Sequence, residues 1–201
     1  ADCGWGMLFG RNAQESGDLC LISRRAAEAS QTPFFNVQDG FLTTHTVETV
    51  RLLEPEFMRE YIGSPAEKLV NLMDPDNPMM SGVVQNQDSY MKGKIAQRWY
   101  YDRVEPALVD AFEVFYQKTG RRYDFLLPYK CDDAEYILVG MGCYMETAQA
   151  TVDYLRGKGL KVGALTVMCF RPFPARRIVE ALGHCKAFTV IERMDDPLST
   201  T

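Results

Sequence analysis

The amino-acid sequence predicts an α/β protein in which a parallel-sheet unit is followed by a small doubly wound unit. Two patterns support this fold class: strand–helix–strand over residues 6–37, and strand–helix–strand–helix–strand over residues 136–192. The near-continuous apolar run at 161–170 is typical of a strand covered on both faces, as strands of parallel sheets are. A chain of 201 residues has room for two such units.

The first unit is expected to begin with a strand at 6–10 and a helix at 12–30. Asn12 can cap this helix, and Glu15 follows at the spacing of a capping box. Pro33 ends the helix, because a residue that precedes proline avoids the helical region. Residues 34–37 then form a second strand, which we expect to lie parallel to the first after a right-handed crossover.

The middle of the chain has weaker signals. We expect helices at 54–63, where proline stands near the first position, and at 66–73. Residues 74–78 have the composition of a loop, and residues 79–91 show no period that supports an assignment. A helix at 105–119 has a clear apolar face, and Gly120 suits its end.

The second unit has the clearest pattern. Its expected elements are strands at 136–140, 161–170 and 187–192, and helices at 146–156 and 174–183. Gly140 and Gly142 lie between a strand and a helix, but Met145 stands where a dinucleotide fingerprint needs its third glycine. We therefore interpret this stretch as a tight turn rather than a nucleotide site.

Composition excludes several functions. The net charge is -5 and no basic stripe is present, so nucleic acid is not expected as a partner. No apolar run approaches the ~20 residues of a membrane span, which predicts a cytoplasmic protein outside the membrane. The six cysteines form no Cys-x-x-Cys pair and are expected to be reduced thiols without a metal. The chain begins without methionine, and we expect it to be a piece of a longer polypeptide.

The candidate site follows the second predicted strand. Asp39 and Gly40 form a turn, and Thr43, Thr44 and His45 come directly after it. Ligands bind beyond the carboxyl ends of parallel strands, so Gly40, Thr43, Thr44 and His45 are candidate cofactor-binding residues. The alternative is that this stretch only shapes the turn, with Asp39 bonded to its own backbone.

The chemistry-bearing side chains form no recognisable catalytic set. No Ser/His/Asp or Cys/His arrangement stands out, and no catalytic residue is assigned. His184 follows the end of a predicted helix, where its role is expected to be structural.

Motifs along the whole chain occur in the order of a known enzyme family. Residues 14–19 resemble its Gln-Glu-Ala helix, 33–45 its Pro-Phe…Asp-Gly-Phe-Arg-Thr-Ser-His-Glu stretch, 82–88 its Arg-Gly-Thr-Ala-Gln-Asn-Pro-Asp loop and 119–123 its Thr-Gly-Arg-x-Tyr turn. Residues 133–135, 141–142, 146–147 and 171–173 resemble parts of its next domain. The chain is thus similar to an internal segment of the pyruvate:ferredoxin oxidoreductases and related 2-oxoacid:acceptor oxidoreductases.

The resemblance implies a division into domains. Residues 1–105 would be the C-terminal part of a pyrimidine-binding thiamine domain, and residues 106–120 a bridging helix. Residues 121–201 would form an α/β domain similar to the C-terminal domain of transketolases.

The resemblance also implies an activity for the complete enzyme. A 2-oxoacid, with pyruvate the first choice, would be decarboxylated oxidatively to acyl-CoA and CO2, with ferredoxin or flavodoxin accepting the electrons. The complete enzyme would use thiamine diphosphate, Mg2+ and [4Fe-4S] clusters, work with other domains or subunits, and form a homodimer. This segment would hold none of these cofactors alone and would be inactive by itself.

The chain departs from the family pattern at several positions. Leu42 replaces an arginine, Thr46 a glutamate and Ser81 an arginine, and residues 168–170 replace Arg-Leu-Tyr. These changes leave the preferred 2-oxoacid and the electron acceptor open. Two other functions remain as alternatives: part of a transketolase or an E1-type thiamine enzyme, and a non-catalytic α/β module that docks another subunit.

Overall fold

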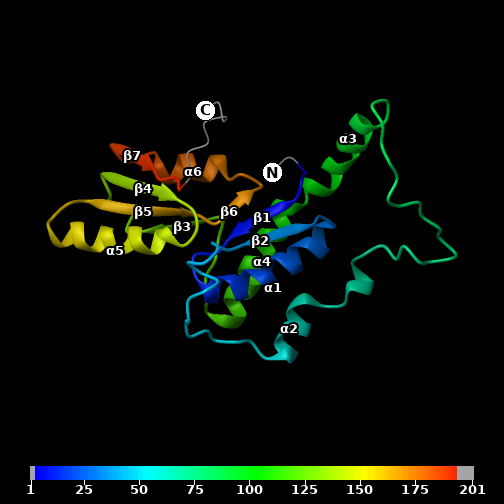
Figure 1. Ribbon diagram of the computed structural model, residues 1–201, viewed down its shortest axis with the longest axis horizontal. Helices are drawn as coiled ribbons and strands as arrows, with labels where there is room; N and C mark the ends of the chain where they lie inside the picture. The colour runs from blue at the N-terminus through cyan, green and yellow to red at the C-terminus, as the bar shows by residue number, and fades with distance from the viewer. Residues whose placement is uncertain (1–2, 194–201) are drawn as a thin grey trace.

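The structure is a computed structural model that describes residues 3–193. Its first sheet has the strand order β2-β1-β6. The strands β1 (Gly6–Phe9) and β2 (Phe34–Val37) are parallel, as predicted, while β6 (Cys169–Arg171) runs antiparallel to β1. The third strand of this sheet therefore comes from the second half of the chain (Figure 1).

The second sheet has the order β3-β5-β4-β7. Its strands are β3 (Leu126–Tyr129), β4 (Tyr136–Gly140), β5 (Val162–Val167) and β7 (Ala187–Val190). The central strand β4 is parallel to both β5 and β7, whereas the edge strand β3 is antiparallel. The predicted α/β fold class is confirmed, and β3 is an element that the sequence patterns did not predict.

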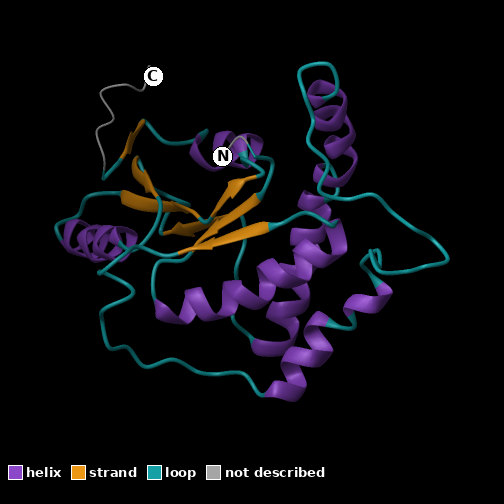
Figure 2. Ribbon diagram, turned by 45° about the vertical axis from the view of Figure 1, so that its right-hand side comes forward, coloured by secondary structure: helices purple, strands orange, loops and turns teal. Residues whose placement is uncertain are grey.

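Helices lie on and beside the sheets (Figures 1 and 2). They are α1 (Ala13–Ser30), α2 (Pro55–Ile62), α3 (Tyr90–Tyr101), α4 (Val104–Thr119), α5 (Tyr144–Gly157) and α6 (Ala175–Leu182), with a 3-10 turn at Pro65–Glu67. The helices α1 and α4 lie against each other, and α5 and α6 lie on opposite faces of the second sheet (Figure 1). Within residues 3–193, none of the helices is both long and apolar enough to cross a membrane.

Local sequence explains the position of α1. The side chain of Asn12 accepts a hydrogen bond from the Glu15 N–H at 2.9 Å, which confirms the predicted cap. The Glu15 carboxylate accepts the N–H of Arg11 at 2.8 Å, one residue before the position that a capping box would use. Leu19 and Ile22 are fully buried, so the apolar face of the helix is covered as predicted.

Two predictions about secondary structure are wrong, and one helix lies where no element was assigned. Residues 66–73 form only the end of a 3-10 turn, because Leu69 and Leu72 stay exposed and no packed face supports a short helix. The helix α3 lies in and beyond a stretch that had no assignment. The predicted strand at 161–170 is interrupted at Met168, because the N–H groups of Met168 and Cys169 both donate to the Phe125 carbonyl and turn the chain toward the first sheet.

One core continues through both sheets. Its fully buried members include Leu8 and Ile22 beside the first sheet, and Ile137 and Leu165 in the second. A separate small cluster beneath α5 contains Met145 and neighbouring apolar residues. The boundary predicted between residues 105 and 121 therefore separates two groups of sequence motifs, but the two units pack against each other through one core. Residues 1–2 and 194–201 of the predicted domains lie outside the described residues.

A buried ion pair fixes the connection between the units. Arg121 binds Asp18 with two nitrogens, at 2.6 Å and 2.9 Å, and the Tyr123 hydroxyl donates to the same carboxylate at 2.7 Å. The Asp18 side chain is only 3% exposed. Burial, followed by the bond to Asp18, raises the pKa of Tyr123 above its ordinary value, so this phenol stays a donor. The motifs at 14–19 and 119–123 thus contact each other.

We expect Arg121→Ala to destabilise the protein by about 3 kcal/mol, because it leaves the Asp18 carboxylate buried without its ionic partner. Urea unfolding measures the change. Arg122→Ala is the matched control: Arg122 is exposed and lies over the Tyr116 ring, and its loss should change stability by less than about 1 kcal/mol. Equal effects of the two substitutions would contradict a special role for the buried pair.

Candidate functional site

The loops that follow β2 and β4 meet at one edge of the molecule. Asp39, two residues after β2, accepts the backbone N–H of Cys143 through Oδ2 at 2.6 Å. Its other oxygen, Oδ1, accepts a hydrogen bond from Arg193 Nη1 at 2.5 Å. The carboxyl ends of strands from both sheets therefore adjoin, which is where α/β proteins place ligands.

The predicted bond of Asp39 to its own turn is wrong. The second unit engages its carboxylate instead, because the amino terminus of α5 presents an N–H to it. Burial raises the pKa of Asp39, but the Cys143 N–H and the Arg193 guanidinium outweigh burial and hold this pKa below its ordinary value. The carboxylate is therefore ionised at neutral pH.

The segment after Asp39, residues 40–46, is named the edge loop here. Beyond it the chain is fastened to the start of α1: the Glu48 carboxylate accepts the Ala13 N–H at 3.0 Å, and the Arg51 N–H donates to the Gln14 side chain at 2.6 Å. The edge loop is thus held between two helix amino termini.

The structure gathers the four predicted site residues in the edge loop but gives them different surroundings. Gly40, Thr44 and His45 are exposed, whereas Thr43 is buried. The Thr44 hydroxyl accepts the Phe41 N–H at 3.0 Å and lies 2.8 Å from His45 Nδ1. Among the described residues, the Thr43 hydroxyl has no hydrogen-bond partner. Their role in binding a cofactor remains a prediction.

Phe41 is a feature of the edge loop that the sequence prediction missed. Its backbone has φ 60°, so Phe41 and not Gly40 adopts the left-handed conformation, at a cost of about 1–2 kcal/mol. The residue is 75% exposed, and its ring lies 4.6 Å from the His45 ring, centre to centre. The sequence carried no signal for this exposure, since a phenylalanine between glycine and leucine is typical of a buried position.

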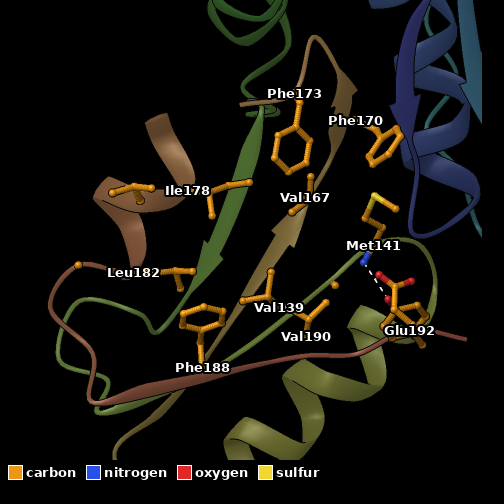
Figure 3. Close-up of a pocket in the computed structure, with 14 residues that line it drawn as sticks. Val139, Met141, Val167, Phe170, Phe173, Ile178, Leu182, Phe188, Val190 and Glu192 are labelled. Carbon is orange, nitrogen blue, oxygen red and sulfur yellow. Dashed lines mark hydrogen bonds between the residues drawn. The ribbon is translucent and has the colours of Figure 1, made fainter. Parts of the chain in front are cut away.

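An apolar pocket of about 540 Å³ lies on the α6 side of the second sheet (Figure 3). Glu192 is the charged residue of its lining, and the Tyr144 hydroxyl is already occupied by the Met141 N–H and the Ile191 carbonyl. Its apolar side chains are Val139, Met141, Val167, Phe170, Phe173, Ile178, Val179, Leu182, Phe188 and Val190. A carboxylate and apolar side chains cannot neutralise phosphates, so this pocket suits an apolar group.

Metal ligands are not gathered in the described part of the chain. No group of three or more His, Cys, Asp or Glu side chains in residues 3–193 is arranged to hold a metal. Cys131 and Cys169 are buried and Cys20 is exposed, each as a free thiol. These residues therefore do not fit a magnesium diphosphate or an iron–sulfur cluster by themselves.

A long excursion, residues 63–101, is named the arm. It projects away from both sheets and ends in α3 (Figures 1 and 2). Its exposed large apolar side chains are Leu69, Val70, Leu72, Met73, Met79, Met80, Val83, Val84, Tyr90, Met91, Ile95, Trp99 and Tyr100. Such an accumulation is typical of a surface that another protein segment covers.

Fold and edge together define a class: a two-part α/β segment in which strand ends from both parts adjoin at a candidate cofactor-binding edge. Comparison of the sequence with known protein families gives two matches from one enzyme family. A family model described as "Pyruvate flavodoxin/ferredoxin oxidoreductase, thiamine diP-bdg" matches residues 1–113, and one described as "Pyruvate:ferredoxin oxidoreductase core domain II" matches residues 134–199. The chain belongs to the pyruvate:ferredoxin oxidoreductase family.

Individual curated relatives support the same family assignment. The pyruvate synthase subunit PorA of Thermotoga maritima is 32% identical over 194 residues, which cover 96% of this chain and 49% of that protein. PorA of Methanothermobacter thermautotrophicus is 34% identical, with coverages of 96% and 50%. The pyruvate-flavodoxin oxidoreductase of Nostoc sp. is 33% identical over 199 residues, 96% of this chain and 16% of the relative. The chain thus spans about half of a PorA subunit and a smaller part of the longer relative.

We expect Thr43→Val to leave the free energy of unfolding unchanged or to raise it by up to about 1 kcal/mol, because the buried hydroxyl has no partner in the described structure. The matched control is Thr46→Val. The Thr46 hydroxyl donates to the carbonyls of Leu42 and Thr43, so its removal should cost about 1 kcal/mol. Thermal unfolding of both variants provides the measurement, and a larger loss in Thr43→Val than in Thr46→Val would contradict the assignment.

Proposed function

We propose that this chain is a cofactor-proximal part of a thiamine diphosphate-dependent 2-oxoacid oxidoreductase, with pyruvate as the first substrate to test. The complete enzyme would convert the 2-oxoacid and coenzyme A to acyl-CoA and CO2 and pass electrons to ferredoxin or flavodoxin. The observation that carries the proposal is the match of a thiamine diphosphate-binding family model to residues 1–113.

The edge loop supports a role close to the cofactor. When bound, thiamine diphosphate supplies the chemistry that lets a 2-oxoacid lose CO2, while the protein binds and orients. The unpartnered Thr43 hydroxyl and the Thr44–His45 pair offer donors and acceptors at the edge where strands of both sheets end. We propose that Gly40, Thr43, Thr44 and His45 face the organic part of the cofactor or the domain interface beside it.

The remaining cofactor groups would be bound elsewhere in the complete enzyme. The described residues do not assemble a site for Mg2+ or for [4Fe-4S] clusters, so other domains or subunits would supply these groups. The exposed apolar surface of the arm supports contact with such domains, or with a second copy in a homodimer. This division of labour makes the isolated segment inactive in our proposal.

The two alternative functions have less support. A transketolase or E1-type enzyme would use the same cofactor without clusters, but both matched family models describe the pyruvate:ferredoxin oxidoreductases. A docking module without catalytic function would account for the arm, yet it would leave the thiamine diphosphate-binding match to residues 1–113 unexplained.

The direct test uses the complete polypeptide with its natural flanking sequence and partner subunits. We expect pyruvate-dependent reduction of a viologen dye that requires coenzyme A and releases CO2. The double variant Thr44→Val and His45→Ala should lower thiamine diphosphate affinity or kcat by about tenfold or more, because small displacements at a reacting centre are costly.

The control for this test is Thr151→Val, on the exposed face of α5. It should leave dye reduction and cofactor affinity at the wild-type level. Pyruvate turnover that does not need coenzyme A, or ketol transfer between sugars, would contradict the oxidoreductase proposal. Unchanged affinity and turnover in the double variant would remove the edge loop from the cofactor site.

A further inference from the structure

The edge loop is attached to the second unit through the Asp39 side chain, whose two oxygens accept hydrogen bonds from two different segments. Asp39 Oδ2 accepts the Cys143 N–H at the amino terminus of α5, and Oδ1 pairs with Arg193, three residues beyond β7. A carboxylate at the amino terminus of a 14-residue helix is stabilised by the unpaired N–H groups and the helix dipole. We infer that Asp39 is a positioning residue that locks the edge loop onto the amino terminus of α5.

Gly142 makes room for this lock. Its φ is +79°, and a Cβ added there would overlap Asp39 Oδ2. Both the backbone conformation and the close approach of the carboxylate therefore require glycine. This explains why a glycine stands here although the dinucleotide fingerprint is incomplete.

The lock acts on the edge loop and not on the union of the two units. That union has other supports: the pairing of β1 with β6, the shared core, and a hydrogen bond of 2.6 Å from the Asn12 side chain to Glu146. The far end of the edge loop is fastened separately, through Glu48 and Arg51. Loss of the Asp39 carboxylate should therefore release one end of the loop while the protein stays folded.

Cys143 reports the state of the lock. Burial, followed by the hydrogen bond and the charge of Asp39, raises the pKa of the Cys143 thiol above its ordinary value. The thiolate is the form that reacts with alkylating agents, so the thiol is held in its less reactive state while Asp39 is in place. Cys20 is exposed on α1 and provides an internal reference in the same molecule.

The experiment compares Asp39→Ala and Asp39→Asn in the complete protein. Peptide mass spectrometry would follow iodoacetamide labelling of Cys143 and Cys20 at pH 8, together with hydrogen exchange of residues 40–46. In Asp39→Ala we expect Cys143 to label about three- to tenfold faster relative to Cys20, and the edge loop to exchange faster. In Asp39→Asn, which keeps an acceptor but loses the charge, Cys143 should label faster while the loop stays largely protected.

A second pair of variants tests the close approach of Asp39 to residue 142 while the Asp39 side chain itself is kept. Gly142→Ala should displace Asp39 and reproduce the effects of Asp39→Ala on loop exchange. Gly157→Ala is the matched control, because a Cβ there meets nothing within 4 Å, and it should behave as wild type. Wild-type labelling of Cys143 and wild-type loop exchange in Asp39→Ala would overturn the inference.

The consequence for catalysis rests on the proposed function. Labelling and loop exchange test the lock, whereas cofactor affinity and turnover test the placement of the loop beside the cofactor. If the edge loop faces the cofactor, Asp39→Ala should lower thiamine diphosphate affinity or kcat, and Asp39→Asn should retain more of both. Faster labelling and loop exchange with unchanged cofactor affinity and turnover would uphold the lock and overturn the placement of the loop beside the cofactor.

Discussion

The pairing of β6 with β1 is the constraint on which the rest of the structure depends. The chain leaves the second sheet at Met168, where the Phe125 carbonyl accepts two successive N–H groups, and adds β6 to the first sheet. Two sheets that share a strand connection and a core cannot move far apart without breaking both. This constraint brings the carboxyl ends of β2 and β4 together, so that Asp39 reaches the amino terminus of α5.

Polar groups at the junction of the units are satisfied by partners from the other unit. Asp18 is neutralised by Arg121 and bonded by Tyr123, and the Asp39 carboxylate is divided between Cys143 and Arg193. The buried Asp18 carboxylate would be costly without Arg121, so this pair penalises any other relative placement of the units, while the Asp39 contacts hold the edge loop. The apolar core supplies most of the stability, and the Asp18–Arg121 pair selects one arrangement.

Sequence patterns predicted the parts of the structure that local chemistry determines. The cap of α1 at Asn12, its buried face and the parallel strands β1 and β2 follow from neighbouring residues. The switch of β6 and the partners of Asp39 depend on contacts between residues 104 to 164 positions apart in the chain. No periodicity encodes them. The helix α3 buries none of its residues, so no apolar face marks it.

Large apolar side chains are exposed on the edge loop and on the arm, where the structure has no covering layer. Phe41 holds a left-handed backbone and is largely exposed, and the arm exposes Met80, Val84 and Trp99. In a self-sufficient domain such positions would be selected toward glycine or polar residues, since strain costs free energy and apolar patches promote association. Their presence on a chain that spans half of a PorA subunit argues that partner surfaces cover them. A rigid lock at Asp39 would then serve to present the edge loop to its partner in one conformation, which lowers the ordering cost of assembling the complete site.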